Sequence, residues 1–249
     1  MRYFICACIL LTFPFVTLNA CSSISYSTVN DAKDPRVDHQ VAEVAKVIEQ
    51  FHFVSVGKPA PGNAPDPLKY GIYRGAVPIV GQIGHPAQWT YQLQEKLDKG
   101  VKLLHDELHI KTILNLETNG RIIETERKAA DKNGVTFISM KLPDSIFKPS
   151  DERVNQIIAI LKDPGYYPLY VHDRDGEDRT GFVIGLYRHF IEGMPGEQAY
   201  QEMKQLGFHS IDKTNSQIGL DCYFRSATGM SAPSNCQFVL TSDPYEFVQ

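Results

Sequence analysis

Short apolar runs alternate with helical patterns along the middle of the chain. Three runs have the length and the apolar content of buried strands, namely Thr112–Leu116, Val135–Met140 and Tyr167–Val171. The spacing of apolar residues predicts helices over Ile122–Asn133, over the segment that starts after Ser150, and over Thr180–Phe190. Buried strands that alternate with helices are typical of a parallel sheet. We therefore expect an α/β fold with a central, mostly parallel sheet flanked by helices.

The part of the chain before residue 70 carries weaker patterns. Apolar residues recur at helical spacing between Val41 and Phe51, and Phe53–Val56 has the composition of a short strand. Gly57–Pro67 holds four prolines and two glycines, which indicates a loop. Ahead of these segments, Ser22–Asp38 is rich in Ser, Asn and Asp without an apolar period, as expected of a tether.

The first twenty residues contain a short apolar segment, and a cysteine follows them at position 21. The apolar run Phe4–Val16 is shorter than a membrane span and follows Arg2, as in a signal peptide. The next residues, Leu18-Asn19-Ala20-Cys21, resemble a bacterial lipobox, in which the cysteine is lipidated, so Cys21 is the candidate lipidation site. An ordinary secretory signal peptide is the alternative, and both predict export. Ser22 after the cysteine resembles lipoproteins sorted to the bacterial outer membrane, facing the periplasm or the cell surface.

Two cysteines, Cys222 and Cys236, remain outside the proposed signal and lipidation segment. In an oxidising compartment they would close a short loop as a disulfide. Two separate buried thiols are the alternative.

The charge balance bears on possible partners. Lys and Arg number 25 against 29 Asp and Glu, which gives a formal net charge of −4. This balance offers no electrostatic reason to expect a nucleic acid as partner. The length of 249 residues and the 43% hydrophobic content suit one globular domain with accessory segments.

A polar turn, His172 to Arg179, separates the strand Tyr167–Val171 from the helix that follows it. Such a turn points several main-chain N–H groups and the positive end of the helix dipole at one small volume, which suits an anion. Arg179 adds a permanently charged fork that can hold two phosphate oxygens. Gly176 lets the main chain turn closely around a ligand.

This loop resembles the signature of the protein tyrosine and dual-specificity phosphatase family, H-C-x-x-x-x-x-R-[ST]. The residues at the matching places are His172, Gly176, Arg179, Thr180 and Gly181. Further resemblance lies in Gly71–Pro78, Lys111–Leu116 and Ala199–Met203, and the ending Asp178–Gly181 is most similar to bacterial and phosphoinositide-type members. The resemblance implies a cysteine-phosphatase-like fold. We accordingly expect a lipoprotein-type signal peptide at 1–20, a flexible tether at 21–40, a dual-specificity-phosphatase-like domain at 41–215 and a C-terminal extension at 216–249.

The resemblance also implies roles for the matching residues. In the family a cysteine thiolate attacks phosphorus, an arginine holds the equatorial oxygens, and an aspartate on a preceding loop protonates the leaving oxygen. Arg179 matches the arginine, Asp144 resembles the acid, with Asp151 as its competitor, and Thr180 would support the nucleophile. His172 would orient the loop. The phosphate-binding group would comprise Arg174, Asp175, Gly176, Glu177, Asp178 and Arg179.

Asp173 stands where the family has its nucleophilic cysteine. A carboxylate is less nucleophilic than a thiolate and would yield an acyl phosphate. Asp173, Asp175, Glu177 and Asp178 also place four carboxylates in the loop against Arg174 and Arg179. Negative charges in the loop itself repel a phosphate dianion and oppose its binding there.

Three hypotheses for this site stay open. The first is an exported pseudophosphatase that binds a phosphorylated ligand with impaired turnover. The second is an active phosphomonoesterase that uses Asp173, with or without a metal ion. The third is an inactivated variant of an ordinary phosphatase. For the second, Asp173-x-Asp175 resembles the first motif of haloacid-dehalogenase phosphatases. The expected partners are a phosphorylated ligand (a phosphoprotein, a phosphoinositide or an inositol phosphate) and a membrane reached through the N-terminal lipid. No cofactor and no resident metal is expected, because the scattered histidines lack ligand-like spacing.

Overall fold

The computed structural model describes residues 35–57, 62, 65–81, 89–143, 145–209, 217–240 and 244–245. The predicted signal peptide, Cys21 and Asp144 lie outside the described residues, as does most of the predicted tether.

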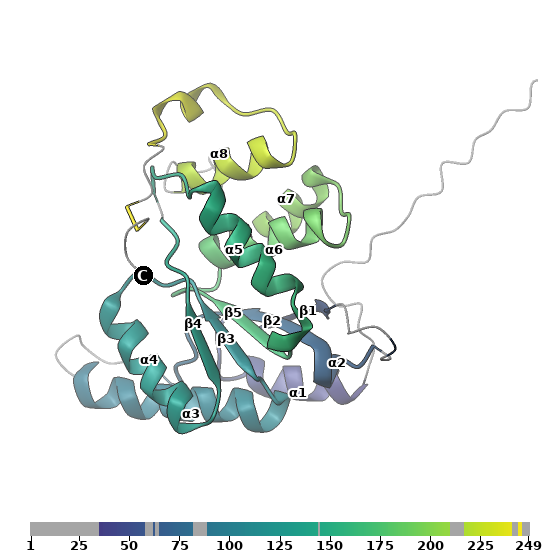
Figure 1. Cartoon of the computed structure of the whole chain (residues 1–249). Coiled ribbons are helices and arrows are strands. Elements are labelled where there is room, and N and C mark those ends of the chain that lie inside the picture. Colours follow the sequence, from purple (N-terminus) through teal and green to yellow (C-terminus); the bar gives the residue numbers. More distant parts are fainter. Residues whose placement is uncertain are drawn as a thin grey trace, which may run out of the picture.

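A five-stranded sheet forms the centre of the described structure (Figure 1), with the strand order β1-β2-β5-β3-β4. The strands are β1 (His52–Val56), β2 (Gly71–Gly75), β3 (Thr112–Asn115), β4 (Thr136–Ser139) and β5 (Leu169–His172). β1 runs antiparallel to β2, whereas the other neighbouring strands are parallel. The predicted α/β fold with a mostly parallel sheet is confirmed.

Helices cover both faces of this sheet (Figure 1). One face carries α1 (Pro35–Ala45), α3 (Trp89–Leu108) and α4 (Gly120–Lys132), and the other carries α5 (Asp151–Lys162), α6 (Asp178–Phe190), α7 (Gly196–Gln205) and α8 (Ile218–Ala227). The shorter helical elements are α2 (Pro67–Tyr70), η2 (Pro164–Tyr166) and η3 (Ser234–Phe238). Among the helices of the described chain, none is both long and apolar enough to span a membrane.

Each strand sends alternate side chains into two separate cores, because successive side chains of a strand point to opposite faces. Ile72, Leu114 and Val171 pack in the core with α5, α6, α7 and α8. Their neighbours Tyr73, Ile113 and Tyr170 pack in the core with α1, α3 and α4. This burial on both faces is why the inner strands read as continuous apolar runs.

The structure corrects two boundaries near the N-terminal end. Helix α1 begins at Pro35, so the last part of the predicted tether 21–40 is helical. The helix ends at Ala45, although the apolar spacing runs on to Phe51. Ile48 and Phe51 are buried but lie outside the helix, so their spacing reports burial rather than helical hydrogen bonding. The long helix α3 did not feature in the sequence prediction.

Candidate functional site

The loop that follows β5 occupies the centre of the sheet edge. In the sheet register, His172 at the end of β5 is level with Gly75 on β2 and with Asn115 on β3. The carboxyl ends of three parallel strands therefore meet at the loop, with residues that follow β2 and β3 on either side of it. Ligands of open α/β sheets bind at such an edge.

The Asp173 carboxylate lies inside the loop and is only 2% exposed. Its Oδ1 accepts hydrogen bonds from Gly176 N at 2.6 Å and from Thr180 Oγ1 at 3.1 Å. Its Oδ2 accepts one from Arg179 N at 3.0 Å and lies 3.3 Å from Arg179 Nε. Each carboxylate oxygen therefore faces two donors, three of them through hydrogen bonds and the fourth, Arg179 Nε, through an ion pair.

Asp173 also completes the N-terminus of α6. The N-cap residue of this helix, Glu177, makes no side-chain cap hydrogen bond. The Asp173 carboxylate instead accepts from the amide of Arg179 in the first turn. A negative group at this place is favourable for the free N–H groups and the dipole of the helix.

The carbonyl groups of the loop are bound on its outer side. Arg174 O accepts from Val77 N at 3.1 Å, Gly176 O accepts from Arg74 Nη2 at 2.6 Å, and Glu177 O accepts from Gly181 N at 2.9 Å. Asp173 O lies 3.0 Å from His172 Nδ1. In a trans peptide the N–H points opposite to the C=O. The amides that follow these four carbonyls therefore turn toward the inside of the loop, namely those of Arg174, Asp175, Glu177 and Asp178.

Gly176 is required by this turn. Its φ of +77° lies in the left-handed region, and a Cβ there would stand 2.4 Å from the carbonyl carbon of Gly75. Both the backbone conformation and the close approach of β2 exclude a side chain. The positive φ agrees with a turn at Gly176, whereas the close approach to a ligand stays a prediction.

Two arginines come to the loop from different parts of the chain. Arg74 of β2 is 1% exposed, and burial lowers its pKa to about 10 while the charge of Asp173 acts in the opposite direction. Arg179 of α6 is buried between two carboxylates, because its Nη1 lies 3.5 Å from Glu117 Oε1 and its Nε faces Asp173. The charge of Arg179 is thus balanced within the protein.

Glu117 follows β3 and is fully buried beside the loop. Its Oε1 accepts from the amides of Thr118 at 2.7 Å and Asn119 at 3.0 Å, and its Oε2 lies 3.3 Å from Arg174 Nε. Burial acts to raise the pKa of Glu117, but the charge of Arg179 and the two amides outweigh it and hold that pKa below its usual value. Glu117 is therefore a fixed negative charge.

His172 contacts the main chain of the loop, as predicted, and a second residue behind it. Its Nε2 lies 2.8 Å from Glu126 Oε1, and both side chains are fully buried. Burial acts to lower the pKa of His172, but the Glu126 carboxylate outweighs it, so the pKa is raised. His172 is therefore held in its charged form more firmly than an exposed histidine.

The other acidic residues of the loop point their side chains away from its centre. Glu177 Oε1 accepts from Gln50 Nε2 at 2.9 Å, and Asp178 Oδ1 accepts from the main-chain nitrogen of His209 at 2.8 Å. Burial raises the pKa of Asp175, Glu177 and Asp178, and the charge of Asp173 adds to this effect at Asp175. The predicted phosphate contacts of these residues can come only from their amides, since their carboxylates would repel a phosphate.

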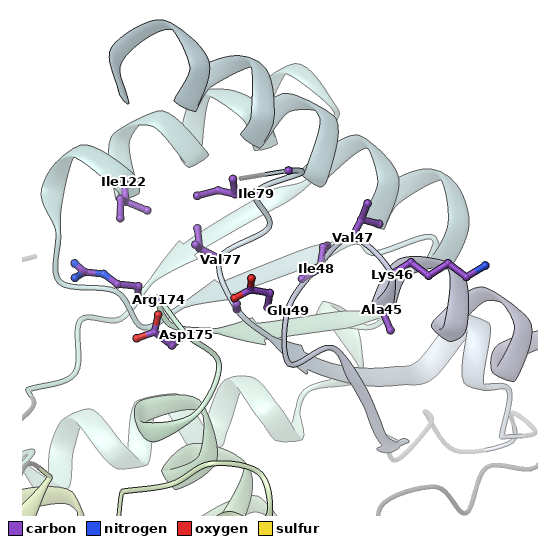
Figure 2. A pocket seen from close by; sticks show the side chains of 12 residues that line it. Ala45, Lys46, Val47, Ile48, Glu49, Val77, Ile79, Ile122, Arg174 and Asp175 are labelled. Atoms are coloured by element: carbon purple, nitrogen blue, oxygen red, sulfur yellow. The ribbon is translucent and has the colours of Figure 1, made fainter. Parts of the chain in front are cut away.

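A pocket of about 580 Å³ adjoins the loop. Arg174 and Asp175 lie at one end of it and Lys46 at the other (Figure 2). Apolar side chains line the space between them, namely Val47, Ile48, Val77, Ile79 and Ile122. The volume is typical of sites for small ligands.

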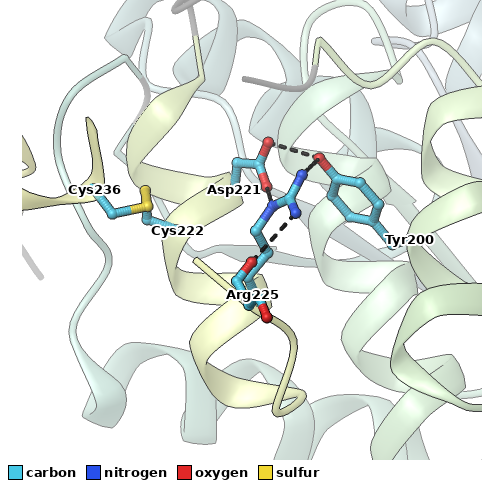
Figure 3. Close-up of a disulfide and its surroundings, with 6 residues drawn as sticks. Tyr200, Asp221, Cys222, Arg225 and Cys236 are labelled. Atoms are coloured by element: carbon cyan, nitrogen blue, oxygen red, sulfur yellow. Dashed lines mark hydrogen bonds and ion pairs between the residues drawn. A yellow bond between two sulfur atoms is a disulfide. The ribbon is translucent and has the colours of Figure 1, made fainter. Parts of the chain in front are cut away.

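The candidate disulfide is present at the C-terminal extension (Figure 3). Cys222 of α8 is bonded to Cys236 of η3, which confirms the pairing expected from the sequence. Next to it Asp221 accepts hydrogen bonds from Arg225 Nε at 2.7 Å and from the Tyr200 hydroxyl at 2.8 Å. These contacts fasten the C-terminal extension to α7.

The structure brings together most of the residues predicted for the site and adds three. Asp144 lies outside the described residues, and its competitor Asp151 lies in the first turn of α5 and interacts with Tyr223. The residues that sequence reasoning missed as site residues are Arg74, Glu117 and Glu126. Among the described residues, no group of three His, Cys, Asp or Glu side chains is placed to hold a metal ion.

A comparison with protein families finds a match for part of the chain. Residues 101–211 match the model of the tyrosine phosphatase family. The predicted resemblance is confirmed for this stretch of the chain, which holds β3, α4, β5, the loop and α6. The assignment to a bacterial branch stays a prediction.

Individual relatives are more distant. The tyrosine-protein phosphatase-like protein OCA2 of Saccharomyces cerevisiae is 28% identical over 87 residues, which are 35% of this chain and 44% of that protein. The match thus spans less than half of the relative.

Solved structures of similar shape include TpbA of P. aeruginosa, with a TM-score of 0.49, 19% identity and coverage of 72% of this chain and 84% of that one. The core catalytic domain of the PP-IP phosphatase SIW14 of S. cerevisiae has a TM-score of 0.46 and 17% identity, covering 66% of this chain and 79% of that one.

Proposed function

We propose that this protein binds a phosphorylated ligand at the loop 172–179 without hydrolysing it. The observation that carries the proposal is the bonding of Asp173. Both oxygens of its carboxylate face donors, so an attack on phosphorus would require Asp173 to give up hydrogen bonds from its own loop. A carboxylate stabilised in this way is a poor nucleophile.

The loop nevertheless keeps the elements of an anion site. Four amides, of Arg174, Asp175, Glu177 and Asp178, turn inward because the carbonyls before them are bound outside. The N-terminus of α6 adds its dipole. A phosphate ester would lie over the Asp173 carboxylate, and the rest of the ligand would extend into the pocket beside Arg174.

The charges around the loop limit the affinity. Five carboxylates surround it, from Asp173, Asp175, Glu177, Asp178 and Glu117, against three guanidinium groups, from Arg74, Arg174 and Arg179. A dianion about 5 Å from an uncompensated carboxylate is opposed by roughly 3 kcal/mol per unit charge at an effective dielectric constant of 20. We expect weak binding that depends on ligand groups beyond the phosphate.

The ligand is proposed to be a phosphoprotein, a phosphoinositide or an inositol phosphate. We also propose that the chain is exported as a lipoprotein through Cys21 and meets its ligand at the outer membrane. The N-terminal sequence supports this location.

Titration calorimetry with phosphotyrosine and with inositol phosphates tests the binding. The wild-type protein is compared with Asp173→Ser, which removes the resident charge and keeps a small acceptor. Asp173→Ser should bind at least about tenfold more tightly, since one like charge is gone. Equal affinities of the two proteins, absence of binding in both, or release of inorganic phosphate by the wild type would each overturn the proposal.

A further inference from the structure

Glu126 carries a charge at a core position of α4. The buried residues of this helix are Ile122, Ile123, Glu126, Ala129 and Ala130, which together form its inner stripe. Glu126 is fully buried among them. A carboxylate at such a position is unfavourable unless it is paired, so its partners indicate why a charge is present.

The partners of Glu126 lead directly to the loop. Its Oε2 accepts a hydrogen bond from Asn115 Nδ2 at 2.7 Å, and its Oε1 lies 2.8 Å from His172 Nε2. The other ring nitrogen, His172 Nδ1, lies 3.0 Å from the carbonyl oxygen of Asp173. The Nε2–Oε1 pair is close enough for an ion pair but is not aligned as a hydrogen bond. With a carboxylate beside one ring nitrogen and a carbonyl oxygen beside the other, the surroundings favour the imidazolium form of His172.

The carbonyl of Asp173 sets the direction of the next amide. The Asp173–Arg174 peptide is trans, so a carbonyl that points out toward His172 turns the Arg174 N–H into the loop. The carbonyls of Arg174, Gly176 and Glu177 have partners of their own that do not involve α4. The first inward amide of the loop is therefore the one that depends on His172.

We propose that Glu126 is a positioning residue for the anion loop: its carboxylate holds His172 in place, and His172 in turn holds the Asp173–Arg174 peptide. Asn115 fixes the second oxygen of Glu126, so the chain of contacts runs from β3 and α4 to the loop. Only the last step, the effect on a bound anion, rests on the function proposed above.

The charge state of His172 tests the first step without any substitution. The charged and titratable groups that face its ring are Glu126 on α4, Asp173 in the loop and Tyr170 on β5. Nitrogen NMR of the imidazole should show both ring nitrogens protonated at neutral pH. A neutral ring at that pH would overturn the proposal, whether or not the protein binds phosphate.

The second step is tested with Glu126→Gln and a matched control, Glu124→Gln. Glu124 lies on the same helix, its side chain is 61% exposed, and it pairs only with Lys128 at 3.4 Å among the contacts seen in the described chain. Glu126→Gln should make His172 neutral at pH 7 and shift the amide resonance of Arg174. Glu124→Gln should do neither. Unchanged His172 and Arg174 resonances in folded Glu126→Gln would contradict the positioning role.

Sulfate binding tests the last step. Its affinity should fall at least about tenfold in Glu126→Gln, which is the effect of one hydrogen bond to an anion, and should be unchanged in Glu124→Gln. If the wild type binds no sulfate while His172 and Arg174 respond as expected, the function proposed above fails and the positioning role stands. If sulfate binds the wild type and Glu126→Gln equally, the link between Glu126 and the anion fails.

Discussion

The Asp173 carboxylate and the Arg179 side chain bind each other within one loop, with Asp173 Oδ2 3.0 Å from Arg179 N and 3.3 Å from Arg179 Nε. The arginine that the family resemblance assigns to phosphate is thus partly occupied by a carboxylate of the protein itself. Glu117 lies on the other side of Arg179, 3.5 Å from its Nη1. An incoming phosphate must compete with both carboxylates.

Asp173 should be important for stability. Asp173→Ala leaves two loop amides, the Thr180 hydroxyl and the buried Arg179 without this acceptor, and we expect a loss of about 3–5 kcal/mol in the free energy of unfolding. Sulfate should restore part of the loss, because it binds the folded loop in place of the carboxylate. Urea denaturation measures both effects.

The control for this prediction is Asp175→Ala. Asp175 is an exposed residue of the same loop, so its removal should change stability by no more than about 0.5 kcal/mol. Equal stability of Asp173→Ala and Asp175→Ala would show that the contacts of Asp173 contribute little.

Sulfate affinity should increase as the pH falls below neutral. Partial burial raises the pKa of Asp175, Glu177 and Asp178, so these carboxylates take up protons at a higher pH than carboxylates free in water. Sulfate keeps its two negative charges over this range, and each neutralised carboxylate removes one repulsion. Calorimetric titrations at several pH values measure the trend, and Asp175→Asn should reduce its slope. An affinity that is constant or falls on acidification would contradict the electrostatic account.

Gly176 should tolerate no side chain. Gly176→Ala combines a φ of +77° with a Cβ 2.4 Å from the Gly75 carbonyl carbon, and we expect a loss of more than about 3 kcal/mol in unfolding free energy. Gly229 has a similar φ of +73° but no atom within 4 Å of its Cβ position. Gly229→Ala should therefore cost only about 1–2 kcal/mol from backbone strain. Similar losses for the two variants, measured by denaturation, would mean that contact with β2 is unimportant.

The loop was predictable because its functional residues lie close together in the sequence. His172, Gly176, Arg179 and Thr180 lie within nine positions between a clear strand pattern and a clear helix pattern, so their meeting follows from local geometry. The strongly apolar runs of β3 and β5 likewise predicted the buried strands of a parallel sheet.

Arg74, Glu117 and Glu126 were missed because long-range packing brings them to the loop. Arg74 and Glu117 reach it through the register of β2 and β3 with β5, which a single sequence does not contain. Glu117 had one signal, its place directly after the predicted strand Thr112–Leu116, as Asp173 directly follows β5. Glu126 had another, since it is a charged residue within the apolar stripe of a helix.

The disulfide should hold the C-terminal extension against the segment before α5. Lys148 N donates to Leu240 O at 2.9 Å and Leu240 N donates to Ile146 O at 3.0 Å, whereas Gly219 N donates to Ser145 O at 2.9 Å. Cys236→Ser should expose the amides of Lys148 and Leu240 to hydrogen exchange, because the cross-link no longer restrains η3 (Figure 3). The Gly219 amide should stay protected, because Leu220 and Phe224 anchor α8 in the core. Unchanged exchange at Lys148 and Leu240 would show that the extension is held without the disulfide.

Hydrolysis of an aryl phosphate by the wild-type domain and by Asp173→Cys, each with EDTA and with Mg²⁺, tests the central claim most directly. The account predicts no turnover above the buffer rate for the wild type under either condition, and turnover for Asp173→Cys, in which a thiolate stands at the end of the intact loop. Turnover by the wild type that is lost in Asp173→Ser would contradict it and make Asp173 a working nucleophile.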